Sequence, residues 1–312
     1  MPLFCRHNRL TTNCPICSRE LEADLRAKGG RSSSTGRTSR PTTRSASRTG
    51  GAARAGGRSG GVVTRRLARA ADDGYRNPLA PGLRATADAR RLASALYAAA
   101  QRLEPPGPHP VLAEEPDLEQ ASWLAFLLAL AGPDAPDAQA AVLAEAPAWA
   151  QADAVPAPLA DRARTIAAYR AWAERAGSQA AAFTGDTGWS PERRFGRVLE
   201  RLALPGLGRA ARFELLATLG AAGRYPLAAD ALHVRIEDDV TAQAAKRLLV
   251  SGDAGLLERR AADLAQACGL PLAALDRGLV AWAAPGPLPS TDGALPASVR
   301  SALRLPAEDD RP

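Results

Sequence analysis

Apolar residues recur at helical spacing along most of the chain, and two such segments flank one short turn. The first predicted helix starts at Ser190, a capping residue that is followed by Pro191 and an acid. The second runs from Arg209 to Leu219 and is stopped by Gly220. Their apolar faces consist of Phe195, Val198, Leu199 and Leu202 in the first helix and Phe213, Leu215, Leu216 and Leu219 in the second.

The turn between these helices is Leu204-Pro205-Gly206-Leu207-Gly208. The two glycines allow a tight turn and close approach of a ligand, and their N–H groups precede a helix, where anions are favoured. With Arg209 directly after it, the segment has the form of a DNA-binding helix-hairpin-helix, in which Gly206, Gly208 and Arg209 bind phosphate. The alternative is an ordinary turn between two helices, in which Pro and Gly only break one helix and start the next.

The rest of the chain from Pro81 onward is also expected to be helical. The segment from Trp123 to Leu130 is apolar nearly all round, so we expect a helix buried at the centre of the domain and capped by Asp117. No β-branched run alternates with polar residues, so no strand is predicted. The fold class is therefore all-α. Further helices are expected at 85–103, 138–146, 159–175, 239–250, 253–268 and 272–282.

Charge divides the chain unevenly. Residues 1–71 contain 15 basic and 3 acidic residues, whereas residues 72–312 contain 25 basic and 30 acidic residues. Residues 28–71 have 11 basic residues, no acid and almost nothing apolar to bury, which predicts a disordered basic linker over 26–80. This linker either neutralises nucleic-acid phosphates without sequence preference or serves only as a solubilising tether.

Three of the four cysteines and one of the three histidines lie within the first 17 residues. Cys5, His7, Cys14 and Cys17 predict a tetrahedral site for structural Zn²⁺, and metal binding would order a knuckle at 1–25 that has no core of its own. The alternative is a set of reduced thiols or a redox pair. Cys268 stands alone, so the cysteines form no disulfide framework.

No secretory signal precedes this segment. The longest apolar run, Trp123 to Ala131, has nine residues, far fewer than the ~20 needed to cross a bilayer. The expected location is the cytoplasm, in association with the nucleoid. DNA is the predicted partner, with no membrane and no obligate protein partner evident.

An acidic cluster, Glu237-Asp238-Asp239, is predicted to open a helix that carries Lys246 and Arg247. A helix start stabilises carboxylates, so one of these acids is a candidate general base and Lys246 a candidate charge stabiliser. The alternative is routine helix capping by Asp238 or Asp239 beside a solvated charged face.

These segments resemble the helix-hairpin-helix DNA glycosylase superfamily, in which an Asp at the start of such a helix is catalytic. More narrowly, the chain is similar over about 85–285 to the α-glutamyl/putrescinyl thymine pyrophosphorylases. The segments that carry this resemblance are Glu119-Gln120-Ala121-Ser122-Trp123, Phe195-Gly196-Arg197-Val198, Leu204 to Arg209, Asp238-Asp239, Ala244 to Arg247 and Ser251-Gly252-Asp253.

The resemblance implies a two-lobed glycosylase-like domain over 81–284, followed by a flexible tail at 285–312, that holds a base flipped out of DNA. It implies exchange of pyrophosphate on an activated hydroxymethyl-pyrimidine for an amine. Asp238 or Asp239 would act as base, with Lys246 and Glu119 completing the catalytic set. Ala210 stands where lyase-type glycosylases have a lysine, so strand cleavage by that route is not expected. The alternative function is a non-catalytic, zinc-containing nucleic-acid adaptor.

Overall fold

The computed structural model describes residues 70–151, 155–288 and 294–306. The chain divides into units of residues 1–63 and 64–312, and the described residues belong to the second. Within them every regular element is a helix and none is a strand, so the all-α prediction is confirmed for this part of the chain. No described helix has both the length and the apolar character needed to cross a membrane. The knuckle predicted at 1–25 and the predicted basic linker up to residue 69 lie outside the described residues.

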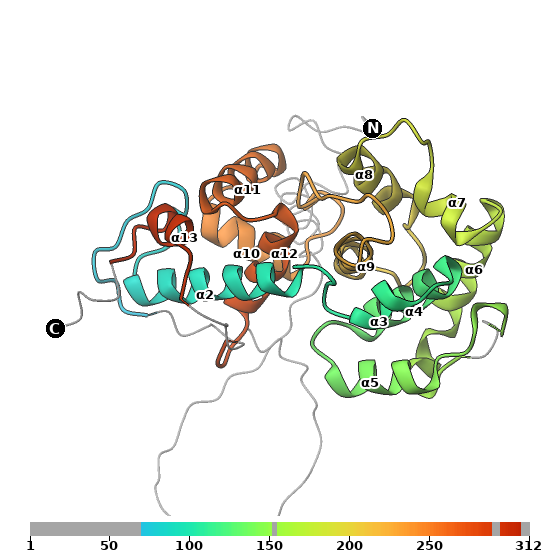
Figure 1. The fold of residues 1–312 in the computed structure, drawn as a ribbon. Coiled ribbons are helices and arrows are strands. Elements are labelled where there is room, and N and C mark those ends of the chain that lie inside the picture. Colours follow the sequence, from blue (N-terminus) through green and yellow to red (C-terminus); the bar gives the residue numbers. More distant parts are fainter. Residues whose placement is uncertain (1–69, 152–154, 289–293, 307–312) are drawn as a thin grey trace, which may run out of the picture. The chain divides into compact units, whose positions relative to one another are not determined.

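The elements follow one another from α2 to α13 (Figure 1). The α-helices are α2 (Thr86–Arg102), α3 (Pro110–Glu114), α4 (Leu118–Ala131), α5 (Pro136–Glu145), α6 (Ala163–Arg175), α7 (Gln179–Thr184), α8 (Pro191–Arg201), α9 (Arg209–Ala221), α10 (Val240–Leu249), α11 (Ala254–Cys268), α12 (Leu272–Ala283) and α13 (Ala297–Ala302). Two 3₁₀ helices, η2 (Trp149–Gln151) and η3 (Ala157–Arg162), separate α5 from α6.

The helix starts follow the predicted caps. Ser190 Oγ accepts a hydrogen bond from the Arg193 N–H at 3.2 Å, with Pro191 as the first residue of α8. Asp117 caps α4 by accepting from the Glu119 N–H at 2.9 Å. One prediction was too simple: the helix expected over 159–175 begins as the 3₁₀ helix η3, because the backbone of Leu159 leaves helical geometry.

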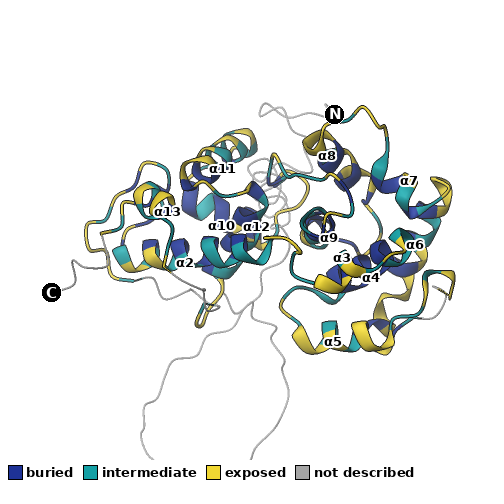
Figure 2. Cartoon of the chain, in the orientation of Figure 1, coloured by how far each residue is buried: buried dark blue, intermediate teal, exposed yellow. Residues whose placement is uncertain are grey.

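The first of two large apolar clusters, here called the aromatic core, joins α3 to α9. At its centre α4 buries every residue from Ala121 to Leu130, as its continuous apolar character predicts (Figure 2). Aromatic rings fill the space around it; Phe126 and Tyr169 stack with ring centres 3.8 Å apart. The rings of this core are Trp123, Phe126, Tyr169, Trp172, Phe183, Phe195, Phe213 and Tyr225.

The second cluster, here called the aliphatic core, joins α2 to α10, α11, α12 and α13 and consists mostly of Leu and Ala. From α2 the chain therefore leaves this cluster for the aromatic core and returns to it at α10. In Figure 1, α2 lies among the helices of the C-terminal part. The Arg91 guanidinium holds α2 against the C-terminal end of α12. It donates to backbone carbonyls there, including those of Ala284 and Gly286 at 2.7 Å.

Both edges of this domain extend beyond the boundaries expected from the sequence. Residues 297–302, expected in a flexible tail, form α13, and Val299 and Leu303 are fully buried. On the other side Asn77, expected in the basic linker, is buried, and its amide donates to the Ala302 carbonyl at 2.8 Å. The first and last described segments therefore pack against each other at the aliphatic core.

Candidate functional site

The turn between α8 and α9 is the segment that the sequence singled out. Gly206 has a φ of +78°, and a Cβ at this position would lie 2.3 Å from Thr165 Oγ1. Both the backbone conformation and the space therefore require glycine here. This requirement arises within the protein, from packing of the turn against α6.

The N-terminus of α9 already binds an anionic group, which is the carboxylate of Glu237 from the same chain. The Arg209 N–H donates to Glu237 Oε2 at 2.8 Å, and a Cβ on Gly208 would lie 3.0 Å from the same oxygen. A carboxylate is favoured at a helix N-terminus by the unpaired N–H groups and the helix dipole. Glu237 thus occupies the position at which a phosphate was expected.

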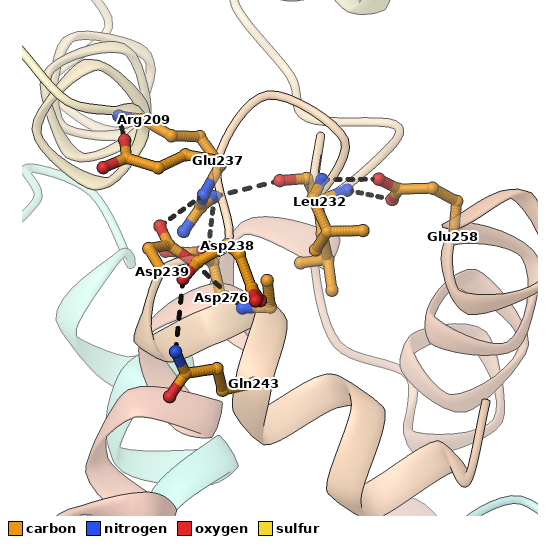
Figure 3. A network of polar contacts seen from close by, with 10 residues as sticks. Arg209, Leu232, Glu237, Asp238, Asp239, Gln243, Glu258 and Asp276 are labelled. Carbon is orange, nitrogen blue, oxygen red and sulfur yellow. Dashed lines mark hydrogen bonds and ion pairs between the residues drawn. The ribbon is translucent and has the colours of Figure 1, made fainter. Parts of the chain in front are cut away.

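The side chain of Arg209 is fully buried and binds two carboxylates (Figure 3). Its Nε lies 2.6 Å from Asp239 Oδ2, and its Nη1 lies 2.8 Å from Asp276 Oδ1. Nη1 also donates to the Leu232 carbonyl at 2.9 Å. Burial alone lowers the pKa of Arg209, but Asp276 and Asp239 together raise it above its ordinary value, so the guanidinium is a fixed cation.

Asp239 and Asp276 differ in their surroundings although they share this cation. Asp239 is the N-cap of α10, and its Oδ1 accepts from the Ala242 N–H at 3.0 Å. Asp276 lies within α12 and is buried. Burial raises its pKa to about 6, the Arg209 guanidinium opposes this, and the Asp239 carboxylate adds to it.

These two carboxyl groups line a pocket of about 390 Å³ between α4, α9, α10 and α12. Its lining includes the small residues Ala129, Gly206 and Ala210. Two of its charged residues are held by partners: Arg277 binds Asp134, with Nη1 to Oδ2 at 2.9 Å, and Glu214 binds Arg102 at 2.6 Å. The polar lining residues are Asp134, Arg162, Glu214, Asp239, Thr241, Asp276 and Arg277.

Asp238 and Lys246, both candidate catalytic residues, do not line this pocket. They form an ion pair at 2.8 Å with their side chains 64% and 41% exposed. The structure thus separates two consecutive acids: Asp239 lines the pocket, and Asp238 faces solvent. Arg247, which follows Lys246, lies with its guanidinium 4.0 Å from the centre of the Trp282 ring.

Glu119 lies at the start of α4 and does not line the pocket either. Its carboxylate accepts from the backbone N–H groups of Gln179 at 3.0 Å and Ala180 at 2.8 Å, which are at the start of α7. This is the helix-capping geometry of a carboxylate at an N-terminus. Trp123, in the same sequence segment, is buried in the aromatic core and donates to the Pro147 carbonyl at 3.0 Å.

Glu258 on α11 holds the loop that leads into the site. Its two carboxylate oxygens accept from the backbone N–H groups of Leu232 at 2.6 Å and Val234 at 2.7 Å (Figure 3). Since the Leu232 carbonyl binds Arg209, Glu258 fixes one of the contacts that orient the guanidinium. The loop then continues to Glu237, so its position also sets the contact at the start of α9.

The described residues do not include the zinc-ligand candidates, which are Cys5, His7, Cys14 and Cys17. The described part of the chain contains no group of three or more His, Cys, Asp or Glu residues placed to hold a metal ion.

Sequence reasoning missed Asp276 and Arg277, which line the pocket from α12. A signal for Asp276 was present: it is the only acid in the segment Leu272–Ala283, where Leu272, Leu275 and Leu279 mark the buried face. An acid three or four residues from such positions is expected to be buried with a partner. Asp134 and Glu214 gave no comparable signal: Asp134 lies in the turn between α4 and α5, and Glu214 lies within α9, which also contains the charged residues Arg209 and Arg212.

Comparison of the chain with known protein families, with curated proteins and with solved structures found no match.

Proposed function

We propose that the domain binds DNA and modifies a pyrimidine base that is turned out of the duplex into the pocket beside Asp239. One observation carries the proposal: the glycine turn and the acid-opened helix, 30 residues apart at Arg209 and Asp239, line the same pocket through Gly206 and Asp239. The volume of about 390 Å³ lies within the range of small-molecule sites. An enzyme that acts on a base must extrude it into such a pocket.

The proposed reaction is that of an α-glutamyl/putrescinyl thymine pyrophosphorylase. An amine nitrogen bonds to the exocyclic methylene carbon of the pyrimidine while the bond from that carbon to the pyrophosphate oxygen breaks. Pyrophosphate leaves with the electron pair, and the proton of the amine passes to the Asp239 carboxylate. Arg162 and Arg277 are the lining cations able to stabilise the leaving group, in place of Lys246.

DNA backbone contact at the turn requires rearrangement of Glu237. Its carboxylate binds the Arg209 N–H, and the residue is exposed, so the side chain is free to turn into solvent when a phosphate approaches. Arg209 itself stays in the buried ion cluster and contributes to phosphate binding through its backbone only. The Glu237→Gln variant should therefore bind duplex DNA more tightly than wild type, because an anion has been removed from the phosphate position.

The test of function is product analysis. Duplex DNA bearing the pyrophosphate ester of 5-hydroxymethyluracil is incubated with the full chain and a primary amine, and its nucleosides are analysed by mass spectrometry. Wild type should form the aminated pyrimidine, and Asp239→Asn should lose at least a hundredfold in rate while still binding DNA. Asp263→Asn, an exposed acid on α11, serves as the matched control.

Two outcomes would contradict this assignment. Turnover lost in Asp238→Asn and kept in Asp239→Asn would make Asp238 the base. Wild-type rates in both variants would make these acids structural only. DNA binding without conversion by wild type favours the second candidate, a non-catalytic adaptor, which the internal contact of Glu237 with the start of α9 also supports.

A further inference from the structure

Asp276 places a second carboxyl group in the pocket, next to that of Asp239. It comes from α12, a helix to which the sequence assigned no chemical role. Both carboxyl groups lie within 2.8 Å of nitrogens of one guanidinium, that of Arg209. The three side chains are 0%, 13% and 11% exposed, so the cluster is shielded from water.

The charges of this cluster do not balance when both carboxyl groups are ionised. One guanidinium neutralises one carboxylate, and a second buried carboxylate without a cation is strongly unfavourable. Two carboxylates in one site raise the pKa of one of them, since a proton removes the excess charge. One of the two acids therefore retains a proton to higher pH than an ordinary Asp.

The contacts identify which acid holds the proton. Asp239 accepts hydrogen bonds from Arg209 Nε and from the Ala242 N–H at a helix start. Asp276 lies within α12 and accepts from no N–H at a helix start. Arg209 and the Thr241 hydroxyl, which also lines the pocket, lower its pKa, but burial outweighs them.

Charged groups on the surrounding helices do not supply the missing cation. On α12 itself Arg277 binds Asp134, and α9 contributes Glu214, which binds Arg102 of α2. Each of these pairs is neutral as a whole. Arg162 of η3 also lines the pocket and pairs with Asp161 at 3.4 Å. With Arg209 on α9 and Asp239 at the start of α10 beside it, Asp276 has a pKa of about 6.

We propose that Asp276, in its protonated form, donates a hydrogen bond to the ligand in the pocket beside Asp239. The ligand it selects is a heteroaromatic base with an acceptor atom, a carbonyl oxygen or an unprotonated ring nitrogen, at that edge. The proton on Asp276 follows from the cluster alone, whereas the identity of the ligand as a DNA base rests on the proposed function. Two neighbouring acids in different environments have different pKa values and can therefore take separate roles.

The first experiment locates the proton without DNA. Carbon-13 NMR of the full chain labelled at the Asp carboxyl carbons should show one carboxyl group that titrates near pH 6. This resonance should be absent from Asp276→Asn and present in Asp263→Asn. If no Asp titrates above pH 5, or if the signal disappears in Asp239→Asn and stays in Asp276→Asn, the proposal is overturned.

The second experiment tests donation to the ligand. The probe is a duplex with the fluorescent pyrimidine pyrrolocytosine in a mismatch, whose emission rises when the base leaves the stack. Affinity of wild type should fall about tenfold from pH 5 to pH 7, as the protonated fraction of Asp276 falls. Asp276→Asn keeps an N–H donor and should show no such change, while Asp263→Asn should behave as wild type.

The two experiments separate this inference from the proposed function. No emission change with wild type at any pH would overturn donation to a base together with the proposed function, and the carboxyl titration would still decide where the proton lies. Emission changes with an identical pH dependence in wild type and Asp276→Asn would overturn the donor role alone.

Discussion

The buried cluster of Arg209, Asp239 and Asp276 and the exposed pair of Lys246 and Asp238 are built from the same kinds of group at the same distances. Nitrogen and oxygen lie 2.6 and 2.8 Å apart in the cluster and 2.8 Å apart in the pair. They differ in exposure, since Arg209 is fully buried and Lys246 is 41% exposed. Contact distance therefore says little about what an ion pair contributes, whereas burial decides it.

The same contrast in burial separates the consecutive acids Asp238 and Asp239. Asp239 caps α10, which turns its carboxylate toward the first turn of that helix and toward Arg209. Asp238 lies one residue outside the helix and reaches Lys246 across its surface. A buried charge left without its partner is costly, but an exposed one is solvated by water. The variants below are expected to separate the two regions by their effects.

The largest effect is expected for Arg209→Met, which removes the cation and keeps an apolar chain of similar length. At pH 7 it leaves the carboxyl groups of Asp239 and Asp276 without their shared cation, and the free energy of unfolding should fall by about 3–5 kcal/mol. The loss should be smaller at pH 5, where Asp276 is protonated. Urea denaturation followed by circular dichroism measures both values. A loss below about 1 kcal/mol at pH 7 would contradict burial of the cluster.

Asp276→Asn should change the pH dependence of stability. Neutral Asp276 contributes stability that is fully present below the unfolded pKa of 3.8 and is lost as pH rises through the folded pKa of about 6. A shift of about two units corresponds to about 3 kcal/mol. The stability of wild type relative to Asp276→Asn should therefore fall by up to this amount between pH 4 and pH 7.5. If the difference in stability between wild type and Asp276→Asn stays constant across this range, as is expected for Asp263→Asn, this prediction is wrong.

Glu258→Gln tests the loop that joins the cluster to α11. The variant replaces one charged acceptor by an amide nitrogen, which cannot accept from a backbone N–H. We expect a loss of about 1–2 kcal/mol, because hydrogen bonds to charged groups contribute roughly 1.5–3 kcal/mol. Faster hydrogen exchange at the Leu232 and Val234 N–H groups would report the loss locally. Unchanged exchange at both would show that the loop is held by other contacts.

The smallest effect is expected for Lys246→Ala. Exposed ion pairs contribute between 0 and about 1 kcal/mol, so the free energy of unfolding should change by less than about 0.5 kcal/mol. The residual effect should decrease further in 1 M salt, where exposed charges are screened. If this variant were as destabilising as Arg209→Met, exposure would not distinguish the two regions.

Much of the fold followed from the sequence, because the relevant signals are local. Apolar residues at helical spacing predicted α8 and α9, and single capping residues such as Ser190 and Asp117 marked where helices begin. The continuous apolar run in α4 predicted its burial. In each case the residues that define the element lie within a few turns of one another.

The arrangement of the site was harder to predict, because it depends on long-range packing. Arg209 was expected to face DNA, since an arginine after a glycine turn gives no sign of the two acids that surround it in the fold. Glu119 was assigned to the pocket because it opens the central helix, yet its carboxylate turns toward α7. α13 was missed because it is short and follows a Pro-rich stretch, although Val299 and Leu303 have helical spacing.

The return of the chain to the aliphatic core has a consequence for biosynthesis. The aromatic core uses one continuous stretch, so it can form while the rest of the chain is still being translated. α2 must wait, because Arg91 and its carbonyl partner at Trp282 are 191 residues apart. At typical elongation rates of 5–20 residues per second this interval lasts roughly ten to forty seconds. During that time the apolar face of α2 has no partner helix of the aliphatic core to pack against on the nascent chain.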